Sequence, residues 1–351
     1  MTRSTGRPAL ALTLGDPAGI GPEILLKSLA DPQITAQAHL TVVAPPELLA
    51  VAWRRLTHQG GPVPDWSDIS ILPVPMEPTW FESVRPGQGT GVTGAISLAC
   101  LETAGRAALE GQFDGVVTAP IAKAAWWAAG RCYPGQTECL AEMAGGMPVG
   151  MAFVARSPHT GWDLRVLLAT VHVPLKDVPR LLTAERLTTQ AELLVDWLRH
   201  SLDISCPRLA VAGLNPHSGE QGHLGTEEQV ALIPWMQAFQ ERHPDVILEG
   251  PVPPDTLWVR PAQAWHHPNA RPSHDAYLAL YHDQGLIPVK VLAFDQAVNT
   301  TLGLPFVRTS PDHGTAFDIA GQGIANPASF KAAITWAARL AQRRFASDPS
   351  P

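Results

Sequence analysis

The sequence predicts an α/β fold whose strands are mostly parallel. Short apolar runs alternate with helix-period segments along most of the chain, which is typical of strand–helix–strand units. Several of these runs end in a glycine-rich turn, as strand-to-helix connections often do. The length of 351 residues, with 45% hydrophobic and 16% charged residues, allows one large or two medium domains with substantial cores.

The elements of the N-terminal half follow from the position of apolar runs and helix start signals. A buried strand is predicted at 9–14, and a glycine-rich turn at 15–21 leads into a helix. Pro22 at the first helical position and Glu23 in the first turn are ordinary helix start signals. The same pattern then predicts strands at 40–43 and 115–118 and helices at 47–56 and from residue 121.

The second half continues the alternation. Two proline-rich stretches, 65–93 and 251–272, are expected to be irregular connections. The predicted strands are 165–170, 208–214, 246–248, 276–281 and 287–292, and the predicted helices are 184–202, 227–242 and 328–345.

Charge and cysteine content limit the class of protein. The formal net charge of −7 gives no basic surface for nucleic acid or for anionic membranes. No run approaches the roughly 18 apolar residues of a membrane helix, and no signal peptide is expected. The four cysteines form neither a CxxC pair nor a disulfide framework, which favours a reducing cytoplasm.

Three histidines share the same local setting. His172, His217 and His282 each follow an apolar, strand-like run. Because ligands of open α/β sheets bind beyond the carboxyl ends of the strands, these imidazoles are expected to converge. Three neutral imidazoles with open coordination positions are typical of a catalytic divalent-metal site, usually zinc. The alternative is that each is a polar residue where the chain reaches the surface.

Two glycine-rich segments were compared with known phosphate-binding motifs, and only one of them, residues 15–21, has the required setting. Residues 89–94 match GxGxxG, but the preceding residues 83–88 do not form the apolar strand that a dinucleotide fingerprint requires. We therefore interpret this segment as a loop that caps a helix at 95–109. The turn at 15–21 does lie between a strand and a helix, where free amides suit an anion.

A third glycine-rich segment, residues 313–327, precedes the last helix. Its glycines allow a ligand close to the backbone, and Asp318 is suited to accept hydrogen bonds from both ribose hydroxyls. The alternative is a surface loop between a strand and a helix.

This loop resembles the adenosine-binding loop of the isocitrate/isopropylmalate dehydrogenase superfamily, which binds NAD without a Rossmann fingerprint. Other long motifs narrow the resemblance to the 4-hydroxythreonine-4-phosphate dehydrogenase family of pyridoxal phosphate biosynthesis. They lie at 15–23 (GDPAGIGPE), 118–123 (TAPIAK), 213–220 (GLNPHSGE), 281–285 (YHDQG) and 299–310 (NTTLGLPFVRTS), and the resemblance spans about residues 9 to 340.

The resemblance implies a fold of two α/β domains with the active site in a cleft between them. By analogy with the superfamily, residues 1–130 and 290–351 form a discontinuous cofactor-binding domain. Residues 131–289 form a central domain that carries the metal-binding histidines and dimer contacts. It further implies a cytoplasmic homodimer whose active site borrows residues from the neighbouring subunit.

The resemblance also implies the reaction. NAD oxidises the secondary alcohol of 4-phosphooxy-L-threonine, and the resulting β-keto acid loses carbon dioxide to give 3-amino-2-oxopropyl phosphate. The metal, zinc or else magnesium or cobalt, is implied to bind His172, His217 and His282. The implied substrate contacts are Gln136, Thr137, Lys290, Asn299 and Arg308, and the implied cofactor contacts are His313, Gly314, Asp318 and Asn326.

One position departs from the family pattern. The family usually has Gly-His-Thr-Glu where this chain has Gly135-Gln136-Thr137-Glu138. Glutamine donates a hydrogen bond but neither carries charge nor shuttles a proton. Relatives in the wider family oxidise other phosphorylated hydroxy acids or aromatic cis-diols, so Gln136 bears on the choice of substrate.

The residues themselves suggest further roles. Lys290 and Arg308 are natural partners for phosphate and carboxylate groups, and the sequence does not say which binds which. Asp283 adjoins His282 and either orients that ligand or acts as a base. A metal-dependent hydrolase and a regulatory metal-binding protein are the competing classes, because three histidines alone also fit them. The loop at 313–327 favours the dehydrogenase.

Overall fold

A computed structural model describes residues 6–270 and 274–346 of the chain, which folds into two compact units. The first comprises Met1–Met147 with Leu304–Pro351, and the second comprises Pro148–Gly303. The first unit is therefore built from both ends of the chain. No helix of the described residues is long and apolar enough to cross a membrane.

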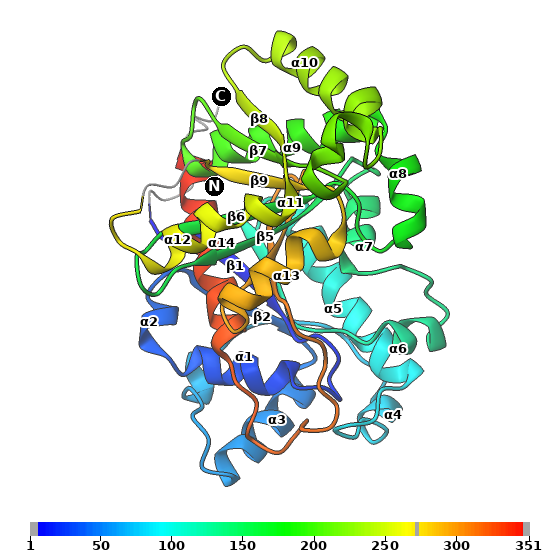
Figure 1. Ribbon diagram of the computed structural model, residues 1–351. Helices are drawn as coiled ribbons and strands as arrows, with labels where there is room; N and C mark the ends of the chain where they lie inside the picture. Colours follow the sequence, from blue (N-terminus) through cyan, green and yellow to red (C-terminus); the bar gives the residue numbers. More distant parts are fainter. Residues whose placement is uncertain (1–5, 271–273, 347–351) are drawn as a thin grey trace. The chain divides into compact units, whose positions relative to one another are not determined.

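Among the described residues, the first unit contains five parallel strands in the order β3-β2-β1-β4-β11. Figure 1 labels β1 and β2 of this set. The strand β1 (Ala9–Thr13) lies at the centre and is almost wholly buried, as its uninterrupted apolar run predicts. The helices α5 (Gly91–Leu109) and α14 (Ala328–Ala346) pack against the central strands, and α1 (Gly21–Leu29) packs against α3 (Pro46–His58) and α14. The remaining strands are β2 (His39–Ala44), β3 (Ser70–Pro73), β4 (Gly115–Thr118) and β11 (Val307–Pro311).

The helices of the first unit follow the start signals read in the sequence. Pro22 lies in the first turn of α1 (Gly21–Leu29), and Thr90 and Thr93 form a capping box at the start of α5 (Gly91–Leu109). The GxGxxG segment thus caps a helix, as expected, but the helix begins at Gly91 and not at residue 95, so residues 91–94 are helical and only residues 89–90 precede it. The other helices are α2 (Pro32–Thr35), α3 (Pro46–His58), α4 (Pro78–Phe81), α6 (Lys123–Ala128), α7 (Gln136–Met143), α14 (Ala328–Ala346) and a 3-10 turn at Trp66–Asp68.

The second unit contains six strands in the order β10-β5-β6-β9-β7-β8. The first three are paired antiparallel and the last three continue parallel from β6, so this part of the sheet is mixed. The strands are β5 (Gly150–Arg156), β6 (Asp163–Leu168), β7 (Arg208–Ala212), β8 (Ile247–Val252), β9 (Ala276–Ala279) and β10 (Val298–Leu302).

The helices of the second unit include two unusual segments near the ends of strands. Pro216–Gly222 is a turn that contains left-handed residues, and Glu228–Leu232 is a short π-helix. The regular helices are α8 (Val178–Leu181), preceded by a 3-10 turn at Leu175–Asp177, α9 (Ala184–Leu202), α10 (Ile233–Arg242), α11 (Pro254–Leu257), α12 (Val259–His266) and α13 (His282–Ala293).

The strand predicted at 287–292 is wrong, because these residues belong to α13. Leu286, Val289 and Ala293 are buried at helical spacing, while Ile287 and Val291 are 61% and 79% exposed. The run is apolar on both faces of a helix, so its continuous hydrophobicity resembled that of a buried strand. The proline-rich stretches also hold regular structure, with β3 and α4 in the first and α11 and α12 in the second.

The limits of the two units differ from those expected for the domains. Residues 131–147 belong to the first unit, where α7 packs against α5. Residues 290–303 belong to the second, because β10 pairs with β5 over its whole length.

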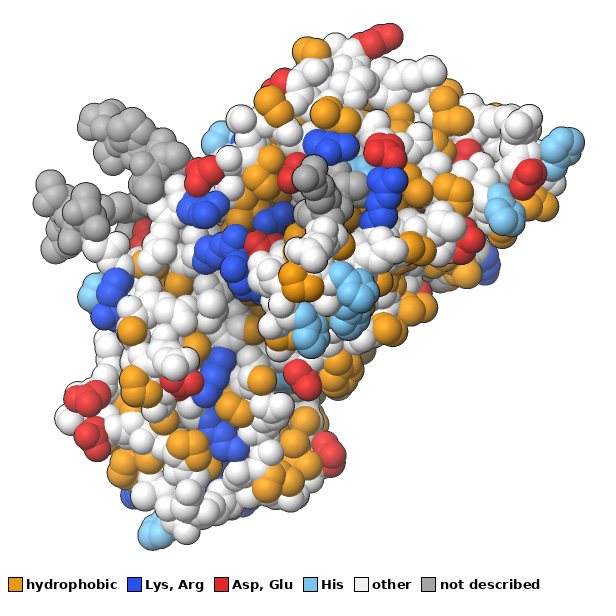
Figure 2. Space-filling view, turned by 60° about the vertical axis from the view of Figure 1, so that its left-hand side comes forward, with side chains coloured by type: hydrophobic (Ala, Val, Ile, Leu, Met, Phe, Trp, Pro, Cys, Tyr) orange, Lys and Arg blue, Asp and Glu red, His pale blue; other side chains and the backbone are white. Residues whose placement is uncertain are grey.

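On the face shown in Figure 2, Lys and Arg side chains are interspersed with acidic ones instead of forming one basic patch.

Candidate functional site

Two of the three predicted metal ligands lie side by side in the second unit. The strands β6 and β9 are parallel neighbours, with Leu168 opposite Ala279, so the residues that follow them emerge at the same edge. The ring centroids of His172 and His282 are 5.7 Å apart. The expected convergence is therefore present for this pair.

Asp283 fixes the orientation of the second imidazole. Its Oδ1 lies 2.7 Å from Nδ1 of His282. A carboxylate that accepts the Nδ1 proton leaves Nε2 with its lone pair available, which is the usual arrangement of a metal-binding histidine. The side chain of Asp283 is 71% exposed, so this contact, and not burial, limits its movement.

His217 is held in a different way. It follows β7 and begins a run of six residues, His217 to Gly222, in which every φ is positive. One turn of left-handed helix is unfavourable for L-residues and persists only where surrounding contacts enforce it. Among the residues that the structure describes, no three His, Cys, Asp or Glu side chains form a group that could hold a metal, so His217 does not complete a site with the other two.

A buried carboxylate that sequence reasoning missed supports this left-handed turn. Glu228 is 1% exposed, and its Oε1 accepts from the backbone amides of Leu214 (2.8 Å) and Asn215 (2.7 Å). Its Oε2 accepts from Nδ2 of Asn215 at 2.9 Å. Glu228 begins the π-helix, a distortion frequent at functional sites. The π-helix is visible only in the structure, so no pattern in the sequence indicated this role.

Arg308 forms a buried cationic centre in the first unit. It is 3% exposed, and its guanidinium donates to Oγ1 of Thr118 at 2.8 Å and of Thr137 at 3.4 Å. Burial lowers the pKa of Arg308 to about 10, and the nearby Glu138 partly opposes this shift. The group thus remains charged at neutral pH and suits an anion.

Gln136 lies at the start of α7, next to Thr137. Its Nε2 donates to the carbonyl of Ala119 at 3.2 Å, and its Oε1 is buried without a hydrogen-bond partner in the part of the chain that is described. A buried acceptor without a donor is unfavourable, so this position is suited to a ligand that donates.

The other two predicted substrate contacts belong to the second unit. Lys290 lies on α13 and is half-buried, and Asn299 lies on β10. Within the described residues, the buried Oδ1 of Asn299 also has no hydrogen-bond partner.

The four predicted cofactor residues occupy the loop before α14. Nε2 of His313 is buried and, among the described residues, has no hydrogen-bond partner, whereas Gly314 faces open space. Asp318 is exposed, and Oδ1 of Asn326 accepts from the amide of Ala328, which makes Asn326 a helix cap. Among these four residues, the buried Nε2 of His313 is the atom best suited to a hydrogen bond with a ligand.

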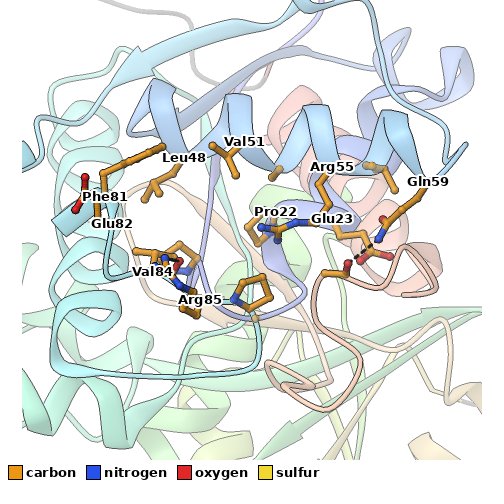
Figure 3. Close-up of a pocket in the computed structure, with 16 residues that line it drawn as sticks. Pro22, Glu23, Leu48, Val51, Arg55, Gln59, Phe81, Glu82, Val84 and Arg85 are labelled. Carbon is orange, nitrogen blue, oxygen red and sulfur yellow. Dashed lines mark hydrogen bonds between the residues drawn. The ribbon is translucent and has the colours of Figure 1, made fainter. Parts of the chain in front are cut away.

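A cavity of about 400 Å³ lies beside this loop, between α1, α3 and the segment after α4 (Figure 3). None of the four predicted cofactor residues lines it, although Gly321 of the same loop does. Its walls are formed by Pro17, Gly19, Pro22, Glu23, Leu48, Val51, Ala52, Arg55, Leu56, Gln59, Phe81, Glu82, Val84, Arg85, Pro86 and Gly321.

A buried ion pair on α1 holds the loop against this cavity. Nζ of Lys27 lies 2.9 Å from Oε1 of Glu23 and donates to the carbonyls of Gly323 (2.9 Å) and Ala325 (2.7 Å). Glu23 in turn accepts from the amides of the same two loop residues, at 3.2 and 2.7 Å. The ion pair and the loop backbone thus provide hydrogen-bond partners for each other's buried polar groups.

The glycine-rich turn at the start of α1 is fixed by Asp16. This side chain is fully buried and accepts from the amide of Ala18 (2.9 Å) and the hydroxyl of Thr93 (3.1 Å). Burial raises the pKa of Asp16, and the two hydrogen bonds oppose that shift. Gly15 has φ +69°, and a Cβ there would lie 2.4 Å from the carbonyl oxygen of Pro120, so no other residue fits.

Comparison with known proteins gives consistent matches over the whole chain. The family model described as "Pyridoxal phosphate biosynthetic protein PdxA" matches residues 26–337. A 4-hydroxythreonine-4-phosphate dehydrogenase of Synechocystis is 56% identical over 96% of this chain and 97% of its own length.

Solved structures give the same result. A 4-hydroxythreonine-4-phosphate dehydrogenase from Klebsiella pneumoniae has a TM-score of 0.80 and 35% identity, covering 96% of this chain and 98% of its own. A terephthalate 1,2-cis-dihydrodiol dehydrogenase from Burkholderia xenovorans follows with a TM-score of 0.63 and 29% identity, covering 93% and 97%.

Proposed function

The chain belongs to the PdxA family of pyridoxal phosphate biosynthetic proteins, and on that premise we propose that it is an NAD-dependent 4-hydroxythreonine-4-phosphate dehydrogenase. It oxidises 4-phosphooxy-L-threonine to a β-keto acid that decarboxylates to 3-amino-2-oxopropyl phosphate. The observation that carries this proposal is 56% identity to a named relative over nearly the full length of both chains.

Two cationic side chains are proposed to bind the anionic groups of the substrate. Arg308 is already oriented by the hydroxyls of Thr118 and Thr137, so it loses little freedom when a phosphate or carboxylate arrives. Lys290 provides the second cation. The unpartnered oxygens of Gln136 and Asn299 are suited to accept from the hydroxyl and ammonium groups of the same substrate.

His172, His217 and His282 are proposed to hold a divalent ion. The adjacent rings of His172 and His282, and the Asp283 contact that frees Nε2 of His282, fit such an ion. A bound divalent ion would act as a Lewis acid on the substrate hydroxyl and lower its pKa. Zinc is the usual occupant of histidine sites, with magnesium or cobalt as alternatives.

The chain's own residues orient the reacting groups. Asp283 is proposed to fix the tautomer of His282. Lys290 is proposed to neutralise an anionic group of the substrate close to the hydroxyl that loses its proton. NAD, when bound, accepts the hydride. His313, Gly314, Asp318 and Asn326 are proposed as its contacts, and the unpartnered Nε2 of His313 supports this.

A homodimer with shared active sites is also proposed. Within one chain His217 remains apart from the other two histidines, which is expected if a site draws ligands from two subunits. The helix α13 exposes Ile287 and Val291, at 61% and 79%, and Phe294 directly after its end is 70% exposed. An apolar stripe of this kind commonly marks an interface between proteins.

Mixing two inactive variants tests the shared site. If each site takes His217 from one subunit and His282 from the other, H217A and H282A variants mixed under conditions of subunit exchange form hybrids with one intact site. Activity should then reappear. Failure to recover activity in verified hybrid dimers would contradict sharing.

The activity itself is tested by NADH formation with 4-phosphooxy-L-threonine, before and after chelation and metal add-back. The enzyme is expected to act in the cytoplasm, where this cofactor is abundant. No NADH formation with this substrate, together with turnover of a cis-dihydrodiol such as the one named for the Burkholderia relative, would redirect the substrate assignment. Hydrolysis without NADH formation would support the competing class of metal-dependent hydrolase.

A further inference from the structure

The strands β9 and β7 stop pairing shortly before the chain reaches the candidate metal ligands that follow them. They are parallel neighbours in the sheet (Figure 1), and their pairing ends with Leu278 opposite Val211. The same register would place Leu280 opposite Gly213 two residues later. At that point a glutamine side chain joins the two segments.

Gln284, in the first turn of α13, makes this link. Its side chain is 6% exposed, its Oε1 accepts from the amide of Leu280 at 2.7 Å, and its Nε2 donates to the carbonyl of Gly213 at 2.7 Å. One carboxamide thus offers an acceptor on one side and a donor on the other, as the peptide group of a strand does. Gln284 therefore takes the place of a backbone link between β9 and β7 where the two strands separate.

A second side chain makes the equivalent link between β9 and β6. The hydroxyl of Thr170, which is 1% exposed, donates to the carbonyl of Leu280 at 2.7 Å. Both backbone groups of Leu280 are therefore bound, the amide by Gln284 and the carbonyl by Thr170. The result is a buried series of hydrogen bonds that connects the ends of β6, β9 and β7.

The first turn of α13 is packed closely against the sheet. A Cβ built on Gly285, next to Gln284, would lie 2.6 Å from Cδ2 of Leu168 on β6 and 3.0 Å from Cβ of Ala279 on β9. Only glycine fits there without displacing a neighbour. This close approach limits the movement of the Gln284 side chain, so the link that it makes is rigid.

Each strand end joined in this way lies two to four residues before a candidate metal ligand, His172, His282 or His217. Because each residue has only two soft backbone dihedral angles, a displacement of the link is passed on to the imidazole. The turn that carries His217 is held again just after Gly213, where two backbone amides donate to Glu228. Buried side chains thus fix this segment on both sides.

We propose that Gln284 and Thr170 are positioning residues that set the placement of the metal-binding histidines. The inference rests on the proposed metal site and adds two residues that act through the backbone of Leu280 and Gly213. In the proposed homodimer, one chain presents His217 and His282 to different sites, so a link within that chain affects both sites.

Cobalt binding by the variant Q284M tests the proposal, with Q190M as the matched control. Gln190 is also a buried glutamine of the second unit, 9% exposed, and its Nε2 donates to the carbonyl of Val149 at 3.2 Å. Val149 leads into β5, which carries none of the three histidines. Methionine has a similar length and lacks the carboxamide, so each variant loses a buried hydrogen bond.

We expect Q284M to bind Co²⁺ about 10- to 100-fold more weakly in calorimetry, because residues that orient metal ligands have effects of this size. The visible absorption spectrum of the bound Co²⁺ should also change, since it reports the geometry of the ligands. Q190M should keep the affinity and the spectrum of the unmodified protein. Urea denaturation of both variants separates these effects from a general loss of stability.

The pair T170V and T170S tests the same series of hydrogen bonds without changing Gln284. Valine keeps the branched shape of threonine but lacks the hydroxyl, whereas serine keeps the hydroxyl. T170V should weaken Co²⁺ binding and T170S should retain most of the affinity. This pair also decides the question if Q284M does not fold.

The remaining outcomes are equally decisive. Unchanged Co²⁺ affinity and spectrum in both Q284M and T170V would overturn the proposal, as would an equal loss in Q190M. A loss in Q284M alone would support the role of Gln284 and remove Thr170 from it. If the unmodified protein binds no Co²⁺, the proposed metal site falls and this inference falls with it, whereas normal binding by the variants overturns the positioning role alone.

Discussion

Replacing Lys27 with methionine should detach the cofactor loop from α1. The ammonium of Lys27 makes three contacts: one with Oε1 of Glu23 and one each with the carbonyls of Gly323 and Ala325. Methionine has a similar length but no donor, so the carboxylate of Glu23 is left buried without its cation. Glu23 is 7% exposed, and solvent therefore offers it little compensation.

The size of the effect follows from these contacts. Breaking a buried ion pair by removing one partner costs about 3–5 kcal/mol. Glu23 keeps the two amide hydrogen bonds from the loop, so we expect the lower end, about 3 kcal/mol, in the free energy of unfolding. The double variant K27M/E23Q should recover part of the loss, since it leaves no uncompensated charge and its single amide oxygen still accepts from one of the two loop amides.

Urea denaturation of the four members of this cycle measures the effect. Lys331→Met is the matched control, because its 2.7 Å ion pair with Asp31 is 28% and 27% exposed and should contribute far less to stability than a buried pair. If the loop detaches without global unfolding, the loss appears instead as faster hydrogen exchange at Gly323 and Ala325 and as weaker NAD binding. A change below about 1 kcal/mol together with unchanged exchange would refute the reasoning.

Three further outcomes are expected. Burial raises the folded-state pKa of Asp16, so its contribution to stability is present below its unfolded pKa of about 3.8 and is lost as pH rises through the folded value. Urea melts of D16N across this range should lack that component, and parallel pH profiles of the two proteins would contradict it. Glu228→Gln should weaken binding of zinc or cobalt about 10- to 100-fold by loosening the turn that carries His217, whereas the exposed Glu241→Gln should leave the affinity measured by calorimetry unchanged. His217→Ala should abolish metal binding and NADH formation together, and turnover that persists after chelation would remove His217 from the site.

Much of the secondary structure could be predicted from the sequence, because the periodicity of apolar residues determines it locally. The strand at 9–13 and the helix that Pro22 opens were predicted from neighbouring residues alone. The error at 287–292 arose where this signal is ambiguous, since a short apolar run fits both a buried strand and a helix covered on two faces. The strands β3, β5, β10 and β11 were missed, and each is paired with a strand that is distant in the sequence.

By itself, the sequence determined the α/β class, the family and the types of residue that carry the chemistry, because these follow from patterns within a few tens of residues. It placed His172 and His282 after strands, and the parallel pairing of β6 with β9 brought the two rings together. Only the tertiary structure decided that His217 lies on a left-handed turn supported by Glu228, and that Glu23 and Lys27 hold a loop about 300 residues away. Such contacts depend on which surfaces the folded chain brings together, and no local periodicity encodes them.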